Sequence, residues 1–164
     1  MKNLLAAFCL CLFSTIGLTQ ERPDMAPFFA ASLLDAAGKP VAMSTYKGKP
    51  LVVNFWARWC PPCRAEIPEL NEFSKQHAGK ITVLGIGIED DPAAVKAFAA
   101  DFPIRYPVFL SGPNGPQMMQ MLGNPRAGLP FTLFVDRHGR VVGQKLGLLR
   151  KNDLEAAAPL LLAR

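Results

Sequence analysis

The feature that most constrains the fold is an apolar segment that gives way, within four residues, to a helical pattern. Residues 51–56 are apolar except at Asn54, which is typical of a strand buried on both faces. Apolar residues then recur at helical spacing over about 61–77, and a second apolar run covers 81–88. Strand, helix and strand in this order predict a core of parallel β-strands.

The other elements complete one α/β domain. We predict a short hairpin within 21–50, a turn or short helix near 44–47, a helix opened by Asp91-Pro92 and running to about 100, a strand at 108–110, a helix at 117–122, a hairpin of 131–135 and 141–146, and a last helix at about 151–162. The late hairpin adds antiparallel edges, so the expected sheet is mixed. The 164 residues provide one proper core, and no internal repeat is visible.

Residues 1–20 have the pattern of a secretory signal. Lys2 gives a positive start, 4–18 are almost wholly apolar or small, and no acidic residue precedes position 21. The apolar part is shorter than the roughly 17–25 residues of most membrane spans. We expect 1–20 to be a signal peptide or a short N-terminal membrane anchor, and 21–164 to form the domain. Export, periplasmic or otherwise, would place the domain's cysteines in an oxidising compartment.

The formal net charge of +5 is spread along the chain. No basic run with interleaved aromatic residues is present, as a nucleic-acid surface would show. We expect a monomer with no nucleic-acid partner.

Cys60 and Cys63 bracket two prolines where the strand gives way to the helix. As a structural staple, a four-residue ring contributes only about 2 kcal/mol, against about 4.7 kcal/mol for a hundred-residue loop. As a structural zinc site, the pair lacks partners, because the domain's only histidines are His77 and His138, in a predicted helix end and a predicted turn. Neither a staple nor a metal site is expected.

A redox role accounts for the arrangement of the pair. The free N–H groups of a helix N-terminus stabilise an anion, so Cys60 should have a lowered thiolate pKa and a surface-facing sulfur. Cys63, one turn further in, could attack a mixed disulfide on Cys60. Pro61 and Pro62 occupy first-turn positions that need no N–H and carry no charge. With no charge between the cysteines the disulfide should be weakly oxidising, which favours a reductant that needs no cofactor beyond its own dithiol.

Residues 54–68, with their Trp-Cys-Pro-Pro-Cys core and with Glu66 and Pro68, resemble the active-site signature of the thioredoxin superfamily, most closely its TlpA/ResA-like branch of exported thiol–disulfide reductases. Gly48-Lys49 and residues 128–136 extend the resemblance, which runs from about position 26 to the C-terminus. It implies a thioredoxin-like fold with a central mixed β-sheet flanked by helices and an N-terminal β-hairpin extension. It also implies reduction of disulfides in partner proteins, with electrons supplied by a membrane thiol–disulfide donor.

The resemblance also assigns residues to partner binding. A cis-proline in this family faces the Cys pair, and the matching bond here is Leu129-Pro130. The Leu129 backbone would then pair with an extended substrate segment. Trp59 and Pro61 flank Cys60 and are expected to contact partners, Trp59 as an apolar lip.

Proton transfer to and from Cys63 needs a nearby acid–base group. Thioredoxin has a buried Asp in the strand before its motif, whereas this chain has Asn54, whose expected role is hydrogen bonding. Glu89 and Asp90, at the end of the next predicted strand, are the expected substitutes, and helix spacing favours Asp90. Glu66 matches a family residue and suits the first turns of a helix.

Two other functions use the same pair. A copper-handling module would bind Cu(I) through both sulfurs, although no nearby His or third sulfur is evident. A peroxidase of the peroxiredoxin type has Thr or Ser ahead of the reactive Cys, where this chain has Ala57-Arg58. For the reductase, compatible substrates include the haem-binding cysteines of apocytochrome c, a copper-site assembly factor and proteins undergoing disulfide repair.

Overall fold

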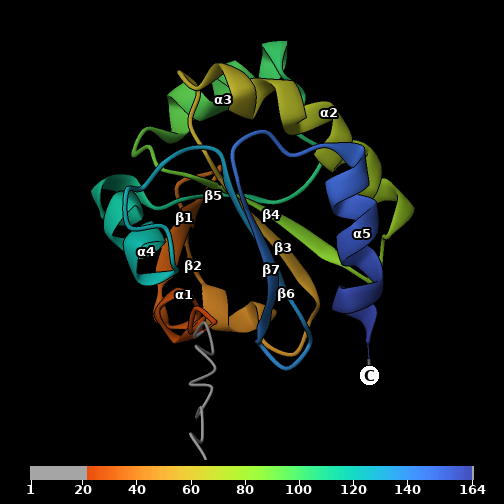
Figure 1. Ribbon diagram of the computed structural model, residues 1–164. Helices are drawn as coiled ribbons and strands as arrows, with labels where there is room; N and C mark the ends of the chain where they lie inside the picture. Colours follow the sequence, from red (N-terminus) through yellow and green to blue (C-terminus); the bar gives the residue numbers. More distant parts are fainter. Residues whose placement is uncertain (1–21, 164) are drawn as a thin grey trace, which may run out of the picture.

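The computed structural model describes residues 22–163, which form a seven-stranded β-sheet with helices on both faces (Figure 1). The expected signal peptide or anchor, 1–20, lies outside the described residues. The strands are β1 (Ser32–Asp35), β2 (Pro40–Ala42), β3 (Leu51–Trp56), β4 (Thr82–Gly87), β5 (Val108–Leu110), β6 (Phe131–Val135) and β7 (Val141–Leu146). The helices are α1 (Ala26–Ala30), α2 (Pro61–Gln76), α3 (Pro92–Asp101), α4 (Gly115–Met121) and α5 (Lys151–Leu162), with 3₁₀ helices η1 (Met43–Tyr46) and η2 (Gly112–Asn114).

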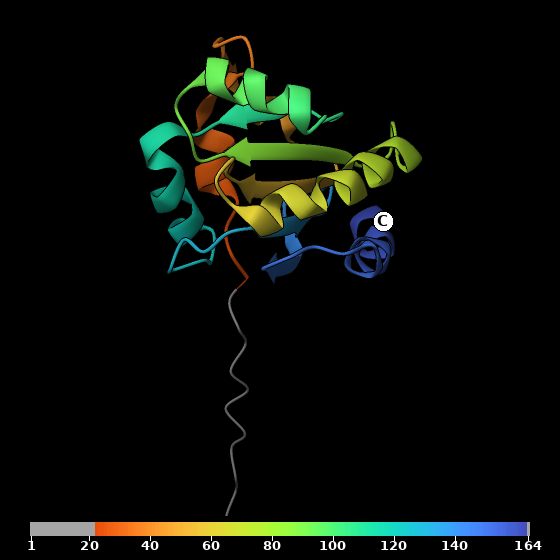
Figure 2. The same ribbon diagram turned by 90° about the horizontal axis from the view of Figure 1, so that it is seen from above.

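The sheet is mixed, as predicted, with the order β2-β1-β5-β4-β3-β6-β7. β3, β4 and β5 run parallel, whereas β6, β7 and the N-terminal hairpin β1–β2 pair in antiparallel fashion. Apolar contacts place α2, α3 and α5 on one face and α1 and α4 on the other (Figures 1 and 2). The α/β architecture with an N-terminal hairpin is therefore confirmed.

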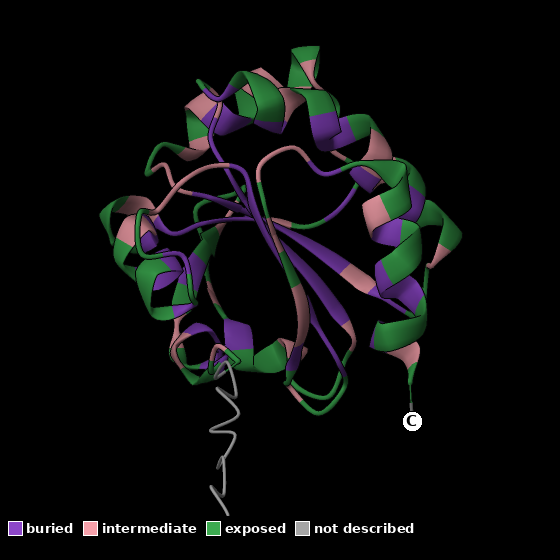
Figure 3. Cartoon of the chain, viewed as in Figure 1, coloured by how far each residue is buried: buried purple, intermediate pink, exposed green. Residues whose placement is uncertain are grey.

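β3 lies inside the sheet because its side chains pack on both faces. All six of its residues are buried (Figure 3), and alternate residues face the two helical layers. Asn54 points toward the α2 side and is in register with Gly85 of β4 and Thr132 of β6. The one polar side chain of the strand therefore lies beneath α2.

The N-terminal segment departs from the prediction. The sequence predicts no helix ahead of the hairpin in 21–50, but residues 26–30 form α1. The Asp24 side chain accepts a hydrogen bond from the Ala26 N–H at 2.9 Å, which supports the helix start. One helical turn lets Phe28 and Phe29 both enter the core, whereas successive strand residues would point to opposite faces.

The remaining elements lie within about two residues of the predicted bounds. Asp91 caps α3 as expected, accepting hydrogen bonds from the N–H groups of Ala93 and Ala94 at 2.9 and 3.1 Å. Within residues 22–163, no helix combines the length and apolar character needed to span a bilayer.

Candidate active site

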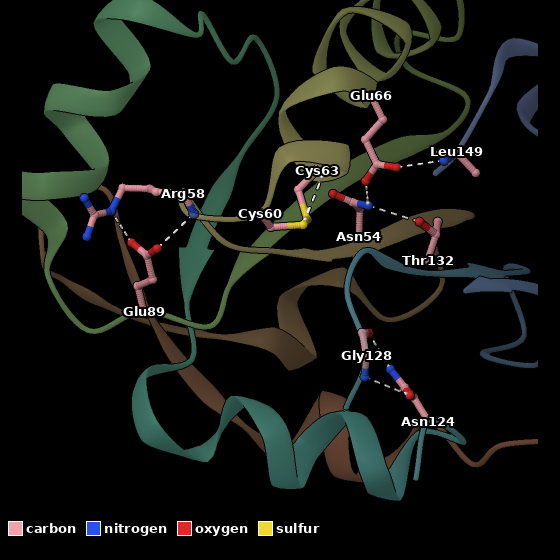
Figure 4. The surroundings of a disulfide bond; sticks show 10 residues. All are labelled: Asn54, Arg58, Cys60, Cys63, Glu66, Glu89, Asn124, Gly128, Thr132 and Leu149. Atoms are coloured by element: carbon pink, nitrogen blue, oxygen red, sulfur yellow. Dashed lines mark hydrogen bonds and ion pairs between the residues drawn. A yellow bond between two sulfur atoms is a disulfide. The ribbon is translucent and has the colours of Figure 1, made fainter. Parts of the chain in front are cut away.

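The Cys pair lies at the start of α2, as the sequence predicts (Figure 4). Cys60 is the N-cap residue with an extended backbone, and Pro61 opens the helix. Cys60 and Cys63 are joined by a disulfide with their Cα atoms 5.3 Å apart. The Cys60 Sγ also accepts a hydrogen bond from the Cys63 N–H at 3.3 Å. After reduction, the same N–H and the helix dipole would stabilise a thiolate on Cys60.

Cys60 is more enclosed than expected. It is only 4% exposed and Cys63 only 1%, so the surface-facing sulfur of the prediction is wrong for the oxidised protein. The reason is tertiary packing by what we call the active-site cluster. Its buried members are Trp56, Ala57, Cys60, Cys63, Val95 and Leu110, and five further residues pack against them: Ile88, Phe98, Ile104, Val108 and Leu129.

The two tryptophans next to the Cys pair differ sharply in burial. Trp59 is 67% exposed, so its ring is available to a docking partner. Trp56 is 2% exposed and stacks on Phe98 with the ring centroids 5.4 Å apart. Trp56 is therefore a core residue. The partner-binding roles of Trp59 and of the exposed Pro61 remain predictions.

The Leu129-Pro130 peptide bond is cis, as the family resemblance implied. Pro130 is buried immediately before β6, and Leu129 packs against the active-site cluster. Residues about seventy positions from the Cys pair in the sequence therefore lie next to it in space. Partner binding by Leu129 and Pro130 remains a prediction.

A buried carboxyl group lies directly behind the Cys pair. Glu66 follows Cys63 by three residues, which places both on the same face of α2. It is 0% exposed. Its Oε1 accepts a hydrogen bond from the Asn54 side-chain amide at 2.7 Å, and its Oε2 accepts one from the Leu149 N–H at 2.8 Å. The Asn54 amide also donates to the Thr132 hydroxyl at 3.0 Å, which confirms the hydrogen-bonding role expected of Asn54.

Burial raises the pKa of Glu66 from 4.5 to about 7, outweighing the two hydrogen bonds, from Leu149 and Asn54, that lower it. A carboxyl group with a pKa near neutrality can both accept and release a proton under ordinary conditions. Sequence reasoning gave Glu66 only an electrostatic role at the helix start. The signal was nevertheless present, because Cys63, Glu66, Ile67 and Leu70 follow the spacing of one buried helix face.

The two acids proposed for proton transfer lie in a different setting. Glu89 accepts a hydrogen bond from the Arg58 N–H at 2.8 Å and forms an ion pair with the Arg58 guanidinium (Figure 4). Asp90 is exposed. Glu89 is thus engaged with the turn that leads into Cys60, and the assistance of Glu89 or Asp90 to Cys63 remains a prediction.

Within residues 22–163, no group of three or more His, Cys, Asp or Glu side chains is arranged to hold a metal ion. A Cu(I) ion at the Cys pair would therefore have only Cys60 and Cys63 as candidate ligands among these residue types. The thiol chemistry of the pair, supported by the helix start and the buried Glu66, fits the geometry better.

Comparison with known proteins agrees with this geometry. The family model described as Redoxin matches residues 21–158. The chain belongs to the Redoxin family. It is similar to the thiol-disulfide oxidoreductase ResA of Bacillus anthracis, with 30% identity over 132 residues, covering 79% of this chain and 72% of ResA. The thioredoxin-like protein YneN of Bacillus subtilis is 28% identical over 141 residues, covering 83% of this chain and 75% of YneN.

A solved structure shows the same fold. The putative thiol:disulfide interchange protein DsbE from Chlorobium tepidum matches with a TM-score of 0.71 and 26% identity, over 87% of this chain and 99% of that chain. The expected thioredoxin-like fold is therefore confirmed. The family match, the relatives and the bonded Cys pair together identify the chain as a thiol–disulfide oxidoreductase of the ResA/DsbE type.

Proposed function

We propose that this oxidoreductase works as a reductant, transferring electrons to disulfides of partner proteins outside the cytoplasm. The observation that carries the proposal is the position of Cys60, whose sulfur accepts the Cys63 N–H at a helix start that bears no charged side chain between the cysteines. The dipole and this N–H favour the thiolate that attacks. The absence of a further positive charge there limits stabilisation of the reduced form and so favours electron donation.

The reaction requires two exchanges. The Cys60 thiolate attacks one sulfur of a partner disulfide, the partner S–S bond breaks, and the released partner thiolate takes a proton. The Cys63 thiolate then attacks the Cys60 Sγ, which forms the Cys60–Cys63 disulfide and releases the second partner thiol. Two electrons pass from the dithiol to the partner. A membrane thiol–disulfide donor then restores the dithiol by the reverse exchange.

The second exchange requires that the Cys63 thiol lose its proton, and we assign Glu66 as the acceptor. Its carboxyl group is on the same helix face as Cys63, and burial holds its pKa at about 7. Cys63 is 1% exposed in the disulfide form, so bulk water has little access to its sulfur. Glu89 and Asp90 remain the alternative acceptors.

The cellular setting follows from the sequence. The signal-like residues 1–20 support export, to the periplasm or beyond, and if they are not cleaved, residues 4–18 would tether the domain to the membrane. In an oxidising compartment a reductant is consumed at each turnover, which is why a membrane donor is part of the proposal. Disulfide-bearing proteins, including apocytochrome c and metal-site assembly factors, are the proposed partners.

The Cys63→Ala variant tests this mechanism. It should stop the reaction after the first exchange and leave partner proteins bound to Cys60 as mixed disulfides that dithiothreitol releases. The Cys60→Ser variant is the matched control and should trap nothing. Equilibration of the wild-type protein with glutathione gives the direction of electron flow, since a reductant requires a potential below that of its targets. Trapping by both variants, or a potential as oxidising as that of an oxidase such as DsbA, would refute the proposal.

A further inference from the structure

Asn124 lies just beyond α4 and is 3% exposed. Its side chain makes two reciprocal hydrogen bonds with a single residue, Gly128 (Figure 4). The Nδ2 group donates to the Gly128 carbonyl at 2.8 Å, and the Oδ1 atom accepts from the Gly128 N–H at 3.2 Å. Nδ2 also contacts the Met119 sulfur at 3.9 Å, a weak acceptor. The amide of Asn124 therefore makes the same two hydrogen bonds to Gly128 that the backbone of a residue on a neighbouring antiparallel strand would make.

The segment 128–130, which lies beside the Cys pair, is held by hydrogen bonds at both of its ends. The Gly128 N–H and carbonyl bond Asn124, and the Pro130 carbonyl accepts the Gly147 N–H at 2.8 Å. Between these anchors, neither the N–H nor the carbonyl of Leu129 takes part in a hydrogen bond within residues 22–163. Leu129 packs against the active-site cluster. An unpaired backbone unit next to the Cys pair is suited to pair with an extended segment of a partner.

We propose that Asn124 is a positioning residue for partner docking: by fixing both polar groups of Gly128, it sets the orientation of the Leu129 backbone against which the disulfide-bearing segment lies. The assignment rests on the proposed function, since it requires a partner segment along Leu129. It concerns extended polypeptide substrates, because a small disulfide has no backbone to pair with Leu129.

The side chain at this position must donate and accept at once. Asn does both with one planar amide, whereas Asp at neutral pH lacks the donor and Ala lacks both groups. Because Asn124 is buried, water does not readily replace the lost bonds. The same loop contains Ala127 with φ 48°, a left-handed conformation that residues other than Gly adopt only when their surroundings hold them there. Without the Asn124 pairing, this loop should sample other conformations.

The chain contains a matched control. The Asn71 side chain also makes two hydrogen bonds to the backbone of a loop, donating to the Pro103 carbonyl and accepting from the Arg105 N–H, both at 2.7 Å. That loop precedes β5 and does not include Leu129. Asn71→Ala therefore removes a similar pair of bonds without altering the Gly128 anchor.

The experiment compares two substrates in single turnovers of the pre-reduced protein. Insulin supplies a polypeptide disulfide, and hydroxyethyl disulfide reports the reactivity of Cys60 alone. Asn124→Ala should lower the second-order rate constant with insulin about tenfold, while the hydroxyethyl disulfide rate stays within about twofold. Rates measured at several insulin concentrations should show that the loss comes from weaker binding of insulin. Asn71→Ala should leave both rates within about twofold of wild type. Thermal unfolding of each variant confirms that the assays use folded protein.

A second variant covers the case in which Asn124→Ala does not fold. Asn124→Ser keeps an uncharged hydroxyl that can donate or accept but does not reproduce the planar amide that bonds both Gly128 groups, so it should show the same substrate selectivity with a loss no larger than that of Asn124→Ala. The assignment is overturned if the two substrates are affected equally, or if Asn71→Ala changes their ratio as much. If the wild-type chain reduces neither substrate, the proposed reductase function is overturned together with the Asn124 assignment. If the wild type reduces both substrates and only the predicted selectivity is missing, the Asn124 assignment alone fails.

Discussion

Replacing Glu66 by Gln should remove a large pH-dependent part of the stability of this protein. Glu66 is 0% exposed, and its pKa in the fold is about 7 instead of 4.5 because burial disfavours the charged form. The folded state therefore binds this proton more tightly than the unfolded state does. The resulting stabilisation is fully present below pH 4.5 and is lost as the pH rises to about 7.

The magnitude follows from the two pKa values. The difference of 7 − 4.5, multiplied by about 1.36 kcal/mol per pH unit, gives about 3 kcal/mol. A Gln side chain does not titrate, so Glu66→Gln should lack this contribution. It can still accept the Leu149 N–H, and the Asn54 amide can turn to accept from the Gln NH₂ while the Thr132 hydroxyl donates.

The assay is denaturant unfolding of the oxidised protein between pH 4.5 and 8. The intact Cys60–Cys63 disulfide keeps both sulfurs from titrating. The free energy of unfolding of wild type minus that of Glu66→Gln should fall by about 3 kcal/mol across this range. Glu69→Gln, which removes a partly exposed carboxyl group one turn on, is the control for the loss of a carboxylate from this helix. Parallel curves for wild type and Glu66→Gln would refute the claim that the fold shifts this pKa.

Two further substitutions test other parts of the structure. Asp136→Ala should destabilise the β6–β7 hairpin by about 1–3 kcal/mol, because it removes the acceptor of the His138 and Arg140 N–H groups and the partner of the Arg140 guanidinium. Burial raises the pKa of Asp136, but these hydrogen bonds and the Arg140 charge outweigh burial and lower this pKa below its usual value. The stability advantage of wild type over the variant, measured by denaturant unfolding, should therefore shrink as the pH falls through the acid range. Gly87→Ala should cost about 1 kcal/mol in the same measurement, because its new Cβ would lie 2.9 Å from a methyl group of Leu110, a buried residue with little room to shift. An unchanged unfolding midpoint for either variant would contradict these contacts.

The sequence predicts the local parts of the site well. The apolar strand, the Cys60 cap and the first-turn Pro61 all depend on residues adjacent in the chain, and the structure has each where it was expected. The cap of α3 by Asp91 is predicted for the same reason. Capping and periodicity are short-range effects, so a single sequence contains the information needed to place them.

The resemblance to a known family supplied what local patterns could not. The cis bond before Pro130 is an example, since an X-Pro bond in a folded protein is cis only about 5–6% of the time and nothing next to this proline favours the rarer isomer. Neither the local patterns nor the family resemblance predicted the enclosure of Cys60, because the side chains that cover it come from several elements.

By itself, then, the sequence determined a strand, a cysteine pair and a helix in series, and with them the thiol chemistry at the helix start. Only the tertiary structure decided which side chains surround that chemistry. Asn54 meets Thr132 across 78 positions of the chain, and Glu66 meets the Leu149 N–H across 83. Burial and pKa depend on every group that excludes water from a site, and these groups are brought together only when the sheet and its helices have packed.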